Sequence, residues 1–278
     1  MTNILKAIYN ISQLRSFAIV ENYKSSIRIQ QAGDALEYFI KDAFCGSFEI
    51  NNKLEKEKKY RDFFSYSGNP NNPPDFIIKN SDAVEVKKII GLNSTIALNS
   101  SYPKDKLLVN SSMITKACRE CENWTLKDLI YAIGTVKENS LKSLWLVYGS
   151  LYAAEKEVYE RITGAISGSL KHAEGVEFSK TKELGKVKKI DPLGITDLRV
   201  RGMWGIEHPL KVFSYIVEPK KNILNVIISE EKYYSFPKQD ITKLEKEPLI
   251  SINKINVKNP NNPVKLIPSI HIAIKGDK

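Results

Sequence analysis

Cysteine and histidine are scarce in this chain of 278 residues, which has three of each. Three cysteines are too few for a disulfide framework, which agrees with a reducing compartment. Cys118 and Cys121 form a CxxC pair, but no second CxxC and no histidine pair completes the four ligands of a structural zinc site. His172, His208 and His271 are widely separated, so a histidine-based catalytic site is not indicated.

Long hydrophobic runs are also absent, since no stretch reaches the roughly eighteen apolar residues of a membrane-spanning helix. The first residues, MTNILKAIYNISQL, carry apolar side chains at helical spacing but lack a small-residue cleavage site. This pattern predicts an amphipathic helix rather than a signal peptide. We therefore expect a cytoplasmic protein that does not enter a membrane.

No low-complexity linker divides the chain, and 42% of its residues are hydrophobic, so we expect a single domain over residues 1–278. Lysine and arginine outnumber aspartate and glutamate by 42 to 32, a formal net charge of +10. The excess is spread along the chain, which indicates a positive surface that attracts a polyanion. Nucleic acid is the first choice for that polyanion, and a generally lysine-rich surface is the alternative.

The pattern of apolar residues predicts an α/β fold. Residues 26–44 place apolar side chains on one face and predict a helix with Ser25 or Ser26 as its N-cap. A second helix is predicted over residues 155–172. Strands are predicted at 76–78 and 83–86 as a hairpin, at 128–136 and 141–149 as central strands, and at 211–217 and 222–229 towards the end.

The hairpin segment NNPPDFIIKNSDAVEVKKI, residues 71–89, contains charged residues where a packing strand would have apolar ones. A turn centred on Asn80 pairs residues whose numbers sum to about 160, so Asp75 and Glu85 should face each other at roughly 5 Å. Two carboxylates this close repel each other unless a cation lies between them, and oxygen ligands suit Mg²⁺. The hairpin therefore predicts a magnesium site.

Alternation along the second strand places Glu85 and Lys87 on one face and Val84 and Val86 on the other. The valines should pack into the core while the charged pair faces a cleft. A metal held by Asp75 and Glu85 would suit phosphodiester hydrolysis, with Lys87 orienting water or neutralising charge on the phosphate. The alternative is a surface hairpin whose charged side chains are merely solvated.

Pro74 and Asp75, followed by Glu85, Val86 and Lys87, resemble the PD-(D/E)xK nuclease signature. The surrounding sequence, over about residues 28–218, resembles the NgoPII-type family of type II restriction endonucleases. The similar stretches are QAGDALEYFIKDAF, NNPPDFIIKNSDAVEVKKI, ALNSSYPKDKL, ITKACRECENW, YAIGTVKENSLKSLWLVYG, DPLGITDLRVRGMWGIEHP and KVFSYI.

This resemblance implies a PD-(D/E)xK nuclease-like core, a central mixed sheet flanked by helices, with added recognition elements. It implies a Mg²⁺-dependent enzyme that cuts double-stranded DNA at the palindrome GGCC in a restriction-modification system, with a cognate DNA methyltransferase as functional partner. Within 1–278, the catalytic core would occupy about 26–150 and the DNA-recognition elements about 175–215. The role of the C-terminal strands, 216–278, stays open.

An acidic residue on the helix before the hairpin often reaches the metal in nucleases with this signature. Glu37 is our choice as the third metal ligand, although Asp34 lies one turn earlier on a similar face. The alternative is that Glu37 forms an i,i+4 ion pair with Lys41 on a solvated face.

Readout of G·C pairs requires donors to guanine and acceptors from cytosine in the major groove. Asp197, Arg199 and Arg201 supply both among glycines, and the two arginines should point to one side of an extended strand. Phosphate contacts or salt bridges are the alternative roles for the arginines. Further DNA contacts are assigned, from the resemblance, to Asn99, Ser100 and Lys104.

A palindromic target with one active site per chain implies a two-fold symmetric homodimer. Two other functions stay open at this point. One is a basic DNA-binding protein without cleavage, and the other is a structure-specific nuclease, such as a resolvase or repair enzyme, on the same scaffold.

Overall fold

The computed structural model of the chain describes most of its length. The described residues are 1–20, 23, 32–69, 71–91, 94–170, 177–178, 184–188, 191–196, 198–218 and 222–276. Ser25, Ser26, Ile29, His172 and Asp197 lie outside the described residues, and so does the start of the helix predicted from residue 26.

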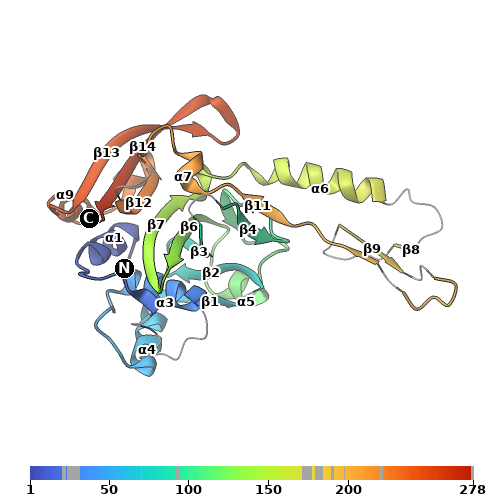
Figure 1. Cartoon of the computed structure of the whole chain (residues 1–278), viewed down its shortest axis with the longest axis horizontal. Coiled ribbons are helices and arrows are strands. Elements are labelled where there is room, and N and C mark those ends of the chain that lie inside the picture. Colours follow the sequence, from blue (N-terminus) through green and yellow to red (C-terminus); the bar gives the residue numbers. More distant parts are fainter. Residues whose placement is uncertain are drawn as a thin grey trace.

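A nine-stranded mixed sheet organises the fold (Figure 1). Eight strands follow one another in space in the order β1 (Phe64–Asn69), β2 (Asn72–Ile78), β3 (Ala83–Ile89), β6 (Leu126–Lys137), β7 (Ser140–Tyr148), β12 (Asn222–Ser229), β14 (Asn262–Lys275) and β13 (Ile250–Asn259). The ninth, β5 (Lys106–Leu108), pairs with β6. Strands β3 and β6 are parallel, as are β7 and β12, while the other pairs are antiparallel. The predicted α/β class, with a central mixed sheet and helices, is confirmed.

Two apolar cores lie on opposite faces of this sheet because side chains alternate along each strand. One core is covered by α1 (Ile4–Ser12), α3 (Ala32–Cys45), α4 (Lys53–Phe63), α8 (Glu230–Ser235) and α9 (Lys238–Glu245). The other is covered by α5 (Lys116–Glu120), η1 (Gly149–Leu151), α7 (Pro209–Val212) and the loops between them.

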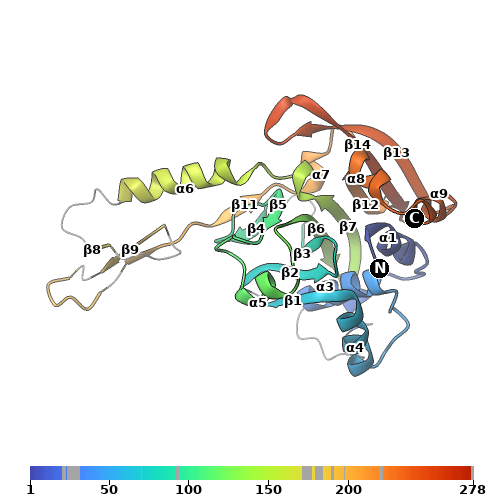
Figure 2. The same cartoon turned by 180° about the vertical axis from the view of Figure 1, so that it is seen from behind.

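A projecting arm leaves the second side of the body (Figures 1 and 2). It consists of α6 (Lys156–Leu170) and a small sheet of β8 (Glu177–Phe178), β9 (Gly185–Lys188) and β10 (Leu198–Val200). The chain returns to the body through β11 (Trp204–Ile206), which pairs with β4 (Ile96–Asn99). The arm thus carries the predicted arginine segment back beside the segment that contains Asn99.

Several predicted elements are confirmed. The first helix buries Ile4, Leu5, Ile8 and Ile11, and Asn3 caps it by accepting from the Lys6 N–H. The predicted face of α3 is buried as expected, at Leu36, Phe39, Ile40 and Ala43. Helix α6 and strands β6, β7 and β12 also lie where the apolar pattern predicts them, with β6 and β7 in the middle of the sheet.

The predicted strand at 211–217 is wrong, because this segment belongs to α7 and the turns that follow it. His208 caps the helix through Nδ1, which accepts from the Leu210 N–H, and Pro209 occupies the first turn. Phe213 and Val217 are buried while Tyr215 between them is exposed, which fits a helical turn rather than a strand, where all three would share one face. In the C-terminal region, β12, β13 and β14 extend the central sheet. Helices α8 and α9 lie between β12 and β13 in the chain.

Among the described residues, no helix is both long and apolar enough to cross a membrane.

Candidate active site

The hairpin of β2 and β3 has the predicted register. Phe76 pairs with Val84 and Ile77 with Ala83, so the partner numbers sum to 160 as expected. Asn80 sits in the turn with a φ of 55°, a left-handed conformation that asparagine tolerates well. The pairing ends at Phe76 and Val84, and just beyond it Asp75 Oδ2 accepts a hydrogen bond of 2.6 Å from the Val86 N–H, close enough to Glu85 for the two charges to interact.

The two faces of β3 also divide as predicted. Val84 is fully buried in the helix-covered core, and Val86 packs against the same core. Glu85 and Lys87 therefore project to the other side of the sheet, where their side chains form an ion pair with Lys87 Nζ 2.6 Å from Glu85 Oε1.

The electrostatics of Asp75, Glu85 and Lys87 indicate that the site lacks a positive charge. Glu85 is only 8% exposed, and its Oε2 is buried without any hydrogen-bond partner. Burial, followed by repulsion from Glu85, raises the pKa of Asp75 well above its ordinary value. Burial alone would lower the pKa of Lys87, but Glu85 and Asp75 raise it, so this lysine is cationic. Buried Glu85 and partly buried Asp75 thus both act on one lysine, and one oxygen of Glu85 has no partner.

Glu37 on α3 does not join this pair directly. Its Oε1 lies 2.6 Å from Lys41 Nζ, which is the alternative interaction weighed from the sequence. Its charge still reaches the hairpin, since Glu37 is among the groups that raise the pKa of Asp75. Asp34 is exposed at the start of the same helix. Within the described part of the chain, no three side chains of the acidic, histidine or cysteine type gather closely enough to hold a metal.

Lys104 lies close to the hairpin on the same side of the sheet. Its backbone N–H donates to the Tyr131 hydroxyl at 2.7 Å, and Tyr131 is the Cα partner of Glu85 in the pairing of β3 with β6. The charges of Glu85 and Lys87 both act on the Lys104 ammonium group. Tyr131 was not singled out from the sequence, because only the pairing of β3 with β6 places it beside Glu85.

Two of the other predicted DNA contacts line a neighbouring cavity of about 340 Å³. Ser100 and Arg201 both line it, together with Trp204, whose strand pairs with the segment of Asn99. Asn99 itself is exposed at the end of β4. Arg199 lies in β10 opposite Lys186, with its side chain exposed like that of Arg201. The position of Asp197 lies outside the described residues.

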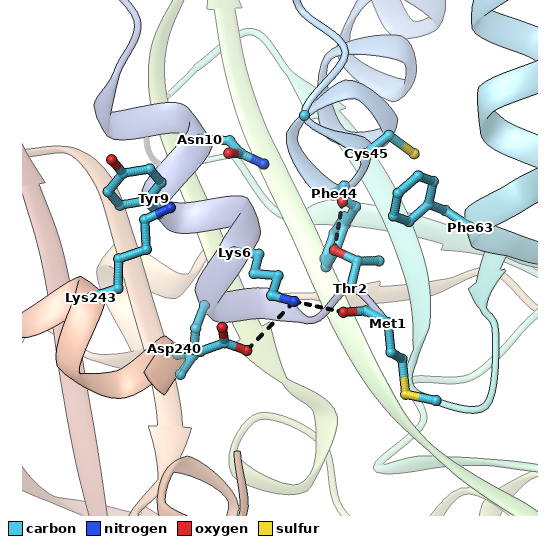
Figure 3. Close-up of a pocket in the computed structure, with 12 residues that line it drawn as sticks. Met1, Thr2, Lys6, Tyr9, Asn10, Phe44, Cys45, Phe63, Asp240 and Lys243 are labelled. Atoms are coloured by element: carbon cyan, nitrogen blue, oxygen red, sulfur yellow. Dashed lines mark hydrogen bonds and ion pairs between the residues drawn. The ribbon is translucent and has the colours of Figure 1, made fainter. Parts of the chain in front are cut away.

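A different cavity, of about 350 Å³, lies on the helix-covered side between α1, α9 and the end of α3 (Figure 3). Lys6 contacts Asp240 there and also donates to the Met1 carbonyl oxygen, while Lys243 lies over the Tyr9 ring. None of Asp75, Glu85 and Lys87 lines this cavity, which separates it from the candidate site.

The three cysteines carry free thiols in three separate settings. Cys45 ends α3, Cys118 is buried in α5, and Cys121 follows α5 with its thiol donating to the Cys118 carbonyl oxygen. Burial raises the pKa of Cys118 to about 12, so this thiol is protonated at neutral pH.

Comparison with known proteins agrees with the resemblance noted in the sequence. The family model of the NgoPII restriction endonuclease matches residues 2–259. The type II restriction enzyme NgoPII of Neisseria gonorrhoeae is 46% identical over 269 residues, which cover 95% of this chain and 96% of that enzyme. No solved structure matches the chain significantly. The family match includes the whole β2–β3 hairpin, and this chain therefore belongs to the NgoPII restriction endonuclease family.

Proposed function

We propose that this protein is a type II restriction endonuclease that hydrolyses phosphodiester bonds in double-stranded DNA at GGCC, using Mg²⁺. The observation that carries the proposal is the hairpin, where buried Glu85 leaves one oxygen without a partner beside Asp75. The family match supports the reaction, and the choice of GGCC rests on the family resemblance alone.

Asp75 and Glu85 are the residues that would hold the metal. Their carboxylate oxygens are the hard ligands that Mg²⁺ prefers, and the unfilled Glu85 Oε2 offers a free acceptor. Glu37 is the proposed third carboxylate, although it would have to leave Lys41 to reach the same ion. Bound Mg²⁺ would act as a Lewis acid on the phosphate and lower the pKa of a bound water.

Lys87 has the geometry of the catalytic lysine in this scheme. Its ammonium group is held beside Glu85 and stays charged, so it can bind a phosphate oxygen or orient the attacking water. We further propose that residues 26–150 contain the PD-(D/E)xK core within a single domain. The sheet itself continues past this range through β12, β14 and β13.

DNA recognition is assigned to the arm and the loops beside it, about residues 175–215. Arg199, Arg201 and Asp197 are proposed to contact bases or phosphates, while Asn99, Ser100 and Lys104 contact the backbone near the cut. The net charge of +10 supports binding to double-stranded DNA. A palindromic site further implies a homodimer with one active site for each strand, and a cognate DNA methyltransferase that protects host DNA in the cytoplasm.

Plasmid cleavage tests the proposal. We expect discrete fragments with Mg²⁺, all ending within one short sequence, and none with Asp75→Ala. The control is Asp62→Ala, which removes an exposed carboxylate on α4 and should cut like the wild type. A wild type that binds DNA without cutting would indicate a binding protein, and cutting confined to branched DNA would indicate a resolvase; either outcome contradicts the proposal.

A further inference from the structure

Four lysines are buried in the part of the chain that the structure describes. Three of them are paired with carboxylates. Lys41 lies 2.6 Å from Glu37, Lys127 lies 2.6 Å from Glu122, and Lys56 is bonded to Asp42. The fourth, Lys104, is 6% exposed and has no carboxylate partner among the described residues.

Among the described residues, only neutral groups hydrogen-bond to the Lys104 ammonium group. It donates to Ser101 Oγ and, at 3.2 Å, to the Tyr102 carbonyl oxygen, and it lies 4.9 Å from the centre of the Tyr102 ring. Burying a cation without a carboxylate in contact is unfavourable, and burial lowers the Lys104 pKa to about 8 although the charge of Glu85 acts to raise it. A fold that keeps such a group in place leaves it ready for an anion from outside.

The backbone of Lys104 is fixed next to the hairpin from two sides. The Tyr131 hydroxyl accepts from the Lys104 N–H at 2.7 Å and lies 3.2 Å from its carbonyl oxygen. On the other side Gly149 makes a close approach, since a Cβ there would collide with the carbonyl oxygens of Lys104 and Asp105. Because Tyr131 pairs with Glu85 in the sheet, this clamp holds Lys104 at the candidate active site.

We propose that Lys104 is a second catalytic lysine, whose ammonium group binds the phosphate being cleaved, and that Tyr131 is the positioning residue that holds it there. The inference rests on the proposed nuclease function and narrows the DNA contact assigned to Lys104 to one phosphate. During hydrolysis a water oxygen bonds to phosphorus and the ester oxygen leaves. Lys104 forms no covalent bond and transfers no proton, but offsets the negative charge that grows on the phosphate oxygens.

Single-turnover cleavage with Mg²⁺ and DNA binding with Ca²⁺ separate this role from general DNA binding. We expect Lys104→Met to slow cleavage at saturating protein by roughly a hundredfold, with Lys104→Arg recovering part of the rate. The matched control is Lys106→Met, two residues along and near Asp128, which should cut at the wild-type rate. If Lys104→Met weakens binding but cuts at the wild-type rate once bound, the proposal is overturned.

A substrate with a neutral methylphosphonate at the mapped cut identifies the phosphate itself. Removing that charge should weaken Ca²⁺-supported binding by the wild type more than binding by Lys104→Met, because the variant has already lost one of the groups that bind this phosphate. A methylphosphonate two nucleotides away should affect both proteins equally. If the methylphosphonate at the cut weakens binding by the wild type and by Lys104→Met to the same extent, Lys104 contacts the DNA elsewhere and the assignment is rejected.

Tyr131→Phe tests the clamp in a variant that keeps the buried ring. We expect slower cleavage, a loss of DNA affinity no larger than that of Lys104→Met, and a smaller loss of rate when Lys104→Met is added, because the lysine is already displaced. Fully additive losses would reject the positioning role. Failure of this inference is distinguishable from failure of the proposed function, because the wild type would then still cut in a manner dependent on Asp75.

Discussion

Two carboxylate sites, one on helix α3 and one on the β2–β3 hairpin, are built in opposite ways. Asp42, on α3, is fully buried, and all of its acceptor capacity is used. It accepts from the hydroxyls of Tyr23 at 2.6 Å, Ser47 at 2.5 Å and Tyr60 at 2.7 Å, and it is paired with Lys56. This cluster ties α3 to α4 and has no acceptor left for a ligand.

The hairpin site leaves its carboxylates incompletely satisfied. Asp75 accepts from the Val86 N–H, Glu85 pairs with Lys87 through one oxygen, and the other oxygen of Glu85 has no partner. Burial of an unfilled acceptor is unfavourable, so the fold tolerates a local loss of stability here. The difference indicates that the Asp42 cluster serves stability, whereas the hairpin is arranged for a ligand that brings positive charge.

Replacing each aspartate by asparagine should give the largest contrast. Asp42→Asn should lower the free energy of unfolding by about 3 to 5 kcal/mol, because Lys56 would keep a buried charge without its partner. Asp75→Asn should cause no loss without metal, since burial and repulsion from Glu85 already make the ionised form of Asp75 unfavourable. Urea denaturation in the presence of EDTA measures the free energy of unfolding of both variants. Equal losses would contradict the idea that only the Asp42 cluster serves stability.

Addition of Mg²⁺ should act on one site only. A ligand present at a hundred times its Kd stabilises the folded state by about 2.7 kcal/mol, so the wild type should melt at a higher temperature with saturating Mg²⁺. Asp75→Asn should lose this increase, and Asp42→Asn should retain it despite its lower starting stability. A full increase in Asp75→Asn would place the metal outside the hairpin.

Per pH unit, the pH dependence of stability should show the smallest effect. Because the folded-state pKa of Asp75 is raised above its ordinary 3.8, the folded protein holds a proton that the unfolded chain has released. Without metal, stability should therefore fall as pH rises from about 4 through the raised pKa, by at most about 1.4 kcal/mol per pH unit. Asp75→Asn should remove this contribution. Urea denaturation at several pH values would then show that the free energy of unfolding of the variant falls less steeply with pH than that of the wild type. The same slope in both proteins would contradict the raised pKa.

Elements with strong local signals were predicted well. The hairpin register followed from its short turn, and the helices at 4–12 and 32–45 followed from the spacing of their apolar residues. The segment at 211–217 misled the prediction, because its apolar residues suit either a strand or a helix. The cap by His208 and the position of Pro209 decided in favour of the helix.

The sequence by itself determined the opposed pair of Asp75 and Glu85, with Lys87 beside it and the valines behind. These residues are close in the chain, so a tight turn and strand alternation are enough to place them. Only the tertiary structure decided what surrounds the pair. Lys104 and Tyr131 reach Glu85 because β3 lies parallel to β6, and pairing between distant segments depends on packing of the whole sheet rather than on local pattern.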